Sequence, residues 1–213
     1  MARTVRRSLN DPAGPPLFVL AGSSGHENRR ALTGRGMVGG PRCGRIVARV
    51  DEQNLLASER AALANFLDAQ REGLIRKVDG LDDPQARTAP TASSLSLLGL
   101  IKHSTTWERR WFGVIVAGRE DRDGWPGVRT DPRDADLIVD DTDTVDFWVS
   151  SYREAIAESN AIVADLDLDS RCARDDIIEC NVRYVLYHMI EETARHAGHA
   201  DIIRETIDGT TGF

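Results

Sequence analysis

The chain has 213 residues, a net charge of −7, 41 % hydrophobic residues and 29 % charged residues, a composition typical of a soluble globular protein. No apolar run approaches the roughly 18 residues of a membrane-spanning helix, so we expect no membrane insertion. Residues 1–50 contain nine Arg and two acidic residues, a net charge of +7, and residues 51–213 therefore carry −14. An acidic body disfavours a surface that follows nucleic-acid phosphates.

The first 50 residues are rich in Gly, Pro, Ser and Arg and show no helical or strand periodicity. They are predicted to be a disordered basic extension. A mis-assigned start is the alternative, since a chain beginning at Met37 or near Val50 would lack most of this region. We therefore expect one folded domain over residues 51–213.

The three cysteines form no CxxC pair, and an odd number without a disulfide framework indicates a reducing compartment. A cytoplasmic protein is expected. Cys172 and Cys180 flank a short loop, so a disulfide between them under oxidising conditions is the less favoured alternative.

Apolar residues recur at helical spacing in four segments after residue 51. The first helix is expected over 54–79, and the second over 94–117, with Ser94 or Ser96 as its cap and Gly118 as its end. The intervening residues 118–141 form a long acidic loop with Gly and Pro. A loop of this length permits a crossover between neighbouring helices and often borders a functional site.

The third helix is expected over 143–166, followed by a connector with a small hairpin near Ile177 and Ile178. The fourth helix is expected over 183–208, with Asn181 as its cap and Gly209 after its end. Four amphipathic helices with little strand signal predict an all-α fold, a four-helix bundle.

The fourth helix carries polar residues on the stripe that should be buried. Steps of four and three residues place six side chains within about 40° of one line: Val185, Met189, Glu192, His196, His199 and Ile203. A carboxylate and two imidazoles inside a core cost several kcal/mol unless something compensates. A bound metal is the compensation that these residue types suit best.

His103 occupies a core-facing position of the second helix, so His103, Glu192 and His196 together form a candidate metal site. Glu192 and His196 are ~6 Å apart along the helix axis, within reach of one ion, whereas His188 is ~12 Å from His196. The set suits Zn²⁺ first, and also Ni²⁺, Fe²⁺ or Mn²⁺. His199 is expected as a fourth ligand, an outer partner or a substrate contact. The alternative is that these are hydrogen-bonded core residues.

Two stretches resemble an actinobacterial branch of the DinB-like superfamily: SSLSLLGLIKHSTTWERRWF (93–112) and HMIEETARHAGHADIIRETIDGTTG (188–212). The resemblance covers about residues 52–213. It implies a four-helix bundle whose divalent metal is held by one residue of the second helix and two of the last. Many members have three His there, but the mycothiol-dependent maleylpyruvate isomerase type has Glu first in the last pair. His103, Glu192 and His196 match that type, and His199 stands where many relatives have Gln.

The resemblance implies a metal-dependent S-transferase that adds a mycothiol-like thiol to a small electrophile. Trp107 and Arg110 are the candidate cofactor-binding residues, and His199 is the candidate catalytic residue. DinB-like proteins are often dimers, which makes a homodimer an expectation. Two alternatives stay open: a metal-dependent hydrolase with His199 or His188 as general base, and a non-catalytic metal-binding stress protein.

Overall fold

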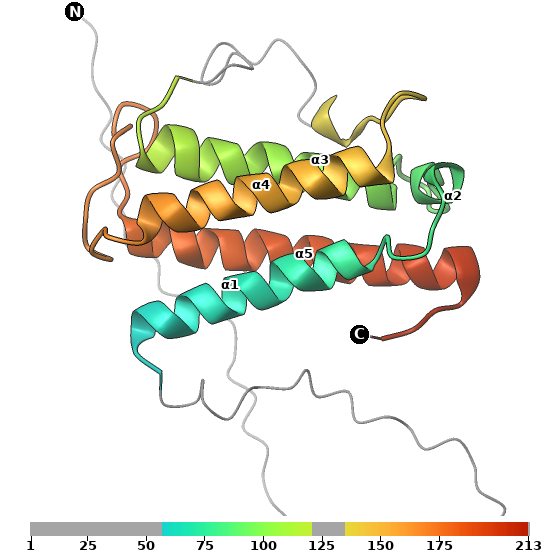
Figure 1. Ribbon diagram of the computed structural model, residues 1–213, viewed down its shortest axis with the longest axis horizontal. Coiled ribbons are helices and arrows are strands. Elements are labelled where there is room, and N and C mark those ends of the chain that lie inside the picture. The colour runs from blue at the N-terminus through green and yellow to red at the C-terminus, as the bar shows by residue number, and fades with distance from the viewer. Residues whose placement is uncertain (1–56, 121–134, 213) are drawn as a thin grey trace, which may run out of the picture. The chain divides into compact units, whose positions relative to one another are not determined.

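The computed structural model describes residues 57–120 and 135–212. Its long helices lie side by side (Figure 1). They are α1 (Glu59–Arg76), α3 (Leu97–Glu108) continued by the π-helix η2 (Arg109–Val116), α4 (Val145–Val163) and α5 (Val182–Asp208), with a short α2 (Asp83–Arg87) and a 3₁₀ turn η3 (Ala135–Leu137). The predicted all-α four-helix bundle is confirmed. The predicted extension over residues 1–50 lies outside the described residues.

The helix ends follow local chemistry. Ser96 Oγ accepts a hydrogen bond from the Gly99 N–H at 3.0 Å, and Asn181 Oδ1 accepts one from the Tyr184 N–H at 2.9 Å, so both expected caps are present. Gly209 ends α5 with φ 75°, a conformation that glycine adopts without strain. The expected first helix is shorter at its C-terminal end, because α1 stops at Arg76 and turns follow.

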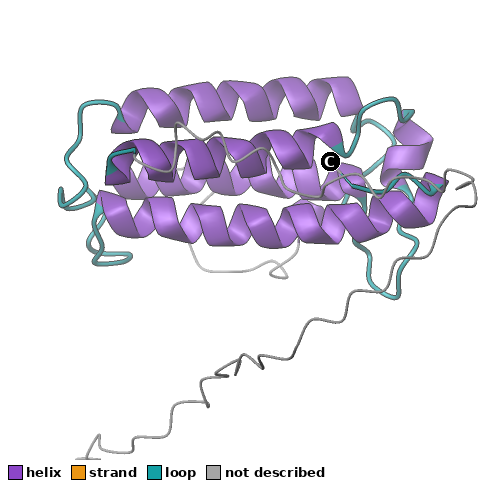
Figure 2. Ribbon diagram, turned by 90° about the horizontal axis from the view of Figure 1, so that it is seen from below, coloured by secondary structure: helices purple, strands orange, loops and turns teal. Residues whose placement is uncertain are grey.

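The chain between α3 and α4 makes a crossover. In Figure 1, α3 and α4 run in the same direction, whereas α1 and α5 run in the opposite one. Figure 2 shows, in the view from below, the connections gathered at the two ends of the bundle. Of the predicted acidic loop, residues 121–134 lie outside the described part of the chain.

A polar layer separates two apolar clusters of the core. One cluster joins the ends of α1 and α5 to the start of α3, and the other joins the starts of α1 and α5 to η2 and the connector. Outside both clusters are the buried polar side chains of this layer, which come from α1, α3 and α5, namely Arg71, Ser104, Glu108 and Thr193.

The predicted hairpin before α5 is reduced, among the described residues, to one isolated antiparallel bridge between Arg171 and Asn181. Cys172 and Cys180 are free thiols beside it. Burial raises the pKa of Cys172 to about 12, which keeps this thiol protonated and unreactive. None of the helices in the described part of the chain combines the length and apolarity needed to cross a bilayer.

Candidate metal centre

A cavity of about 260 Å³ opens within the polar layer. Its walls come from one face of α3 and η2 and the facing side of α5. The lining residues are His103, Ser104, Trp107, Trp111, His188, Met189, Glu192, Thr193 and His196. The structure thus brings the three predicted metal ligands, from two helices, to one cavity.

The two imidazoles of the predicted set are adjacent. The ring centres of His103 and His196 are 4.8 Å apart at 79°, and Glu192 Oε2 lies 3.8 Å from His196 Nε2. Both ring nitrogens of His196 are buried and make no hydrogen bond with the described residues. Burial and the neighbouring His103 lower the pKa of His196 to about 4, so the ring is neutral near pH 7. A neutral imidazole with unused buried nitrogens fits a divalent metal.

Glu192 divides its two oxygens between two partners. Arg195 Nη1 donates a hydrogen bond to Glu192 Oε1 at 2.5 Å, while Oε2 is the oxygen that faces His196. The carboxylate is 31 % exposed, so it stands at the rim of the cavity. Arg195 therefore orients Glu192 from the solvent side, as hydrogen bonds around metal-ligating carboxylates commonly do.

The predicted buried face of α5 is wrong at its polar positions. Thr193, Ala197 and Ala200 are buried and face the core. His196 is therefore only at the edge of the buried face, and His199 is exposed. The His199 ring centre is 6.0 Å from that of His196, and His199 is not among the residues that line the cavity.

A second set of possible metal ligands shares Glu192. Ligand atoms of His188, Glu191 and Glu192 all lie within 4.8 Å of one another. Glu191 is 63 % exposed, however, and Arg195 pairs with both carboxylates. The His188 ring packs against Trp111 with their centres 4.4 Å apart. Charge compensation by Arg195 accounts for the acidic part of this second set without an ion.

An acidic partner of His103 was not predicted. Asp136 of η3 places Oδ1 3.1 Å from His103 Nδ1. Burial opposes ionisation of Asp136, but His103 and the charge of Arg110 hold its pKa below the usual value. A carboxylate on the second nitrogen of a histidine fixes the orientation of a metal-ligating ring. The approach of η3 needs Gly99, because a Cβ there would lie 2.4 Å from the Leu137 carbonyl oxygen.

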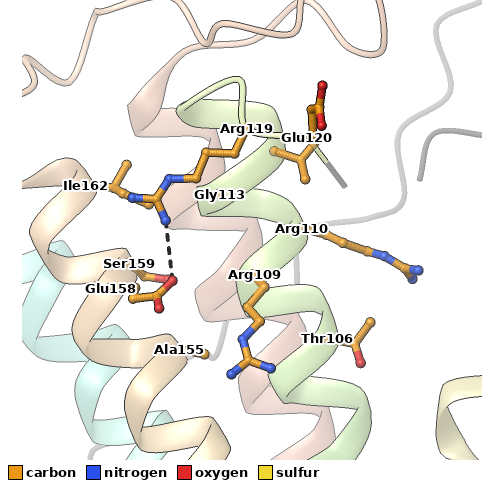
Figure 3. Close-up of a pocket in the computed structure, with 11 residues that line it drawn as sticks. Thr106, Arg109, Arg110, Gly113, Arg119, Glu120, Ala155, Glu158, Ser159 and Ile162 are labelled. Atoms are coloured by element: carbon orange, nitrogen blue, oxygen red, sulfur yellow. Dashed lines mark hydrogen bonds and ion pairs between the residues drawn. The ribbon is translucent and has the colours of Figure 1, made fainter. Parts of the chain in front are cut away.

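The predicted cofactor-binding residues adjoin the cavity. Trp107 lines it, and the Arg110 guanidinium lies over the Trp107 ring, 5.4 Å from its centre. Arg110 also lines a larger cavity of about 780 Å³ between η2 and α4, together with Arg109 and Arg119. Figure 3 shows Arg119 pairing with Glu158, while Arg110 points away from them. This larger cavity contains none of the predicted metal ligands.

Two aromatic residues of the same helices, Phe112 and Trp148, belong to the core and not to the cavity wall. Phe112 is buried in the second apolar cluster. Trp148 packs against the first cluster, and its Nε1–H donates a hydrogen bond to Asp143 Oδ1 at 2.6 Å. Of the tryptophans in the described part of the chain, Trp107 and Trp111 line the cavity.

The helix arrangement and the site define a protein of the DinB-like superfamily. A solved structure of a conserved protein from Enterococcus faecalis matches with a TM-score of 0.56 at 13 % identity, over 72 % of this chain and 99 % of that one, which supports a common fold. The mycothiol S-transferase family model matches residues 62–209, and the chain belongs to this family. No curated protein matches the chain.

Proposed function

We propose that this protein transfers a low-molecular-weight thiol of the mycothiol type to a small electrophile, with a divalent metal, Zn²⁺ in the first place, held by His103, Glu192 and His196. The observation that supports the proposal is the convergence of these side chains on one cavity in a member of the mycothiol S-transferase family. Two imidazoles and a carboxylate suit Zn²⁺, Ni²⁺, Fe²⁺ or Mn²⁺. Cytoplasmic location and a homodimer remain predictions.

A bound divalent ion would lower the pKa of the thiol, so that the cosubstrate binds as a thiolate near neutral pH. Other side chains of the protein would orient the residues that hold the ion. The Asp136 carboxylate lies 3.1 Å from Nδ1 of His103, which favours Nε2 as the ligand atom, while Arg195 donates a hydrogen bond to one oxygen of Glu192. His196 is already neutral and need not lose a proton to bind.

The walls of the cavity suit the attack of a thiolate on an electrophilic carbon. Trp107, Trp111 and Met189 give the site an apolar lining that excludes water from the thiolate. In the transfer, a sulfur–carbon bond forms, the thiol proton passes to solvent, and the leaving group departs with the electron pair of its bond. Trp107, and Arg110 stacked on it, would contact the thiol or the electrophile.

The test combines metal analysis with calorimetry. Wild type, His103→Ala, His196→Ala and Glu191→Gln would be compared for bound metal, for mycothiol binding before and after metal removal, and for thiol-dependent conversion of an aryl chloride. We expect His103→Ala and His196→Ala to weaken metal binding at least about tenfold and to abolish turnover. Glu191→Gln should retain both properties.

Three results would contradict the proposal. Loss of metal in Glu191→Gln with retention in His103→Ala would assign the metal to His188, Glu191 and Glu192 instead. Turnover of an ester or amide without any thiol would favour a metal-dependent hydrolase. Bound metal with no affinity for mycothiol would favour a non-catalytic metal-binding protein.

A further inference from the structure

Three aromatic rings form a continuous surface that leads out of the metal cavity, which we term the aromatic ladder: Trp111, His188 and Tyr184. The Trp111 and His188 ring centres are 4.4 Å apart, and those of His188 and Tyr184 are 6.0 Å apart with the rings parallel to within 3°. Trp111 and His188 line the cavity, whereas Tyr184 is 47 % exposed. The ladder therefore runs from the cavity wall to solvent.

The ladder begins one helical turn from the proposed ligands. Tyr184, His188, Glu192 and His196 follow one another at intervals of four residues on α5, so they share one face of the helix. At a rise of 1.5 Å per residue, His188 and Tyr184 lie about 6 Å and 12 Å from Glu192 along the helix axis. A molecule with one end at Glu192 and His196 can extend along this face over both rings.

We propose that the aromatic ladder binds the sugar part of the thiol cosubstrate, an inference that rests on the proposed function. Mycothiol is an N-acetylcysteinyl amide of glucosamine joined to inositol, so two polyhydroxylated rings follow its thiol. Five bonds separate the sulfur from the first ring, about 6 Å when extended, and the second ring follows about 5 Å further. These spacings match the axial distances of His188 and Tyr184 from Glu192.

The chemistry of the rings also fits. The face of a saturated six-membered ring presents C–H bonds, which pack flat on the negative face of an aromatic ring, and its hydroxyl groups stay at the edge in contact with water. A parallel pair of rings that is open to solvent on one side offers such a surface. Tyr184 is half exposed, so the outer part of the ladder is open to a ligand.

The experiment compares two thiols. Metal-loaded wild type, Tyr184→Ala and Trp111→Leu would be titrated by calorimetry with mycothiol and with N-acetylcysteine amide, which has the same thiol head without the rings. We expect Tyr184→Ala to raise the Kd for mycothiol about three- to tenfold and to leave the Kd for N-acetylcysteine amide unchanged, while Trp111→Leu, which also alters the cavity wall, should raise the Kd for mycothiol at least as much. Tyr187→Ala is the matched control, since Tyr187 is 55 % exposed on the same helix but does not belong to the ladder.

The outcomes separate this inference from the proposed function. Equal loss of affinity for both thiols, or no loss for either thiol in Tyr184→Ala, would overturn the sugar-binding role while the thiol-transfer proposal stands. Tyr184→Ala removes a half-exposed side chain, so it tests the role even if Trp111→Leu fails to fold. Wild type that binds neither thiol would overturn the proposed function, and the inference with it.

Discussion

Arg71 and Glu108 form an ion pair at the centre of the polar layer, where both side chains are almost wholly buried. Arg71 Nε donates to Glu108 Oε2 at 3.3 Å, and its Nη1 donates to Asp68 Oδ1 at 2.7 Å and to Asn160 Oδ1 at 2.9 Å. Burial raises the pKa of Glu108 in spite of the opposing charge of Arg71. The carboxylate therefore depends on this one guanidinium.

Arg71→Met should destabilise the protein by about 3–5 kcal/mol, because it leaves a buried carboxylate without its cation. The double variant Arg71→Met with Glu108→Gln should lose less, since no buried charge then remains unpaired. Urea denaturation of the single and double variants measures both losses. Equal losses would show that the packing of Arg71, rather than the charge of Glu108, sets the cost.

At the level of elements, the turn η3 packs directly against α3 at Gly99, because glycine has no side chain to keep it away. Gly99→Ala should move η3 outward and separate Asp136 from His103, which should weaken metal binding about tenfold. Asp136→Asn keeps the turn in place but lacks the charge, and it should weaken metal binding without unseating η3. Competition with a metal-binding dye would measure both affinities. Wild-type affinity in Asp136→Asn would assign Asp136 a purely structural role.

Hydrogen bonds to Asp143 stabilise the start of α4. Its Oδ2 accepts hydrogen bonds from Lys102 Nζ and from the Asp140 N–H, each at 2.9 Å, while Oδ1 accepts from Trp148. Burial disfavours the ionised carboxylate, but these hydrogen bonds outweigh it and hold the pKa of Asp143 below its usual value. The stabilisation is therefore complete above the unfolded pKa of about 3.9 and is lost as the pH falls through the folded value.

Asp143→Asn should lower the free energy of unfolding by about 1–2 kcal/mol at pH 7, because a charge-assisted bond to Lys102 is lost. The difference from wild type should shrink as the pH falls below about 4. Urea denaturation between pH 3 and pH 7 would follow it. A difference independent of pH would mean that the charge of Asp143 contributes nothing.

For the whole molecule, a metal bound between α3 and α5 would join the two halves of the bundle. At a metal concentration of 100 times the Kd, binding adds about 2.7 kcal/mol to the stability of the folded state. A chelator should therefore lower the Tm of the metal-loaded protein by about 5–10 °C. The Tm of His196→Ala should not respond to it, and an equal response would place the metal elsewhere.

The sequence predicted the bundle well because its signals are local. Ser96, Asn181 and Gly209 mark helix ends through contacts within one turn. The burial of α5 was predicted less well, because His196 and His199 compete with Ala197 and Ala200 for the core face and only packing decides between them. The presence of Ala197 and Ala200 next to the two histidines is the signal that the prediction overlooked.

The partner of His103 was beyond prediction. Asp136 lies 33 positions further along the chain, in a segment with many acidic residues, and nothing in its neighbours distinguishes it. The contact depends on Gly99, which lets η3 approach α3. The aromatic ladder was equally hidden, because it joins η2 to α5 across the bundle.

The π-helix η2 contains one residue more than an α-helix needs to cover the same span. This residue changes the direction in which the later side chains of the helix point. In an α-helix, each step of four residues drifts by about 40°, so His103, Trp107 and Trp111 would spiral away from one another. The wider turn of η2 reduces that drift between Trp107 and Trp111, and Trp111 lines the cavity. Deleting one residue between Trp107 and Trp111 should make this part of the helix regular, and it should rotate Trp111 away from the ligand path by about 100°, together with the buried residues that follow it.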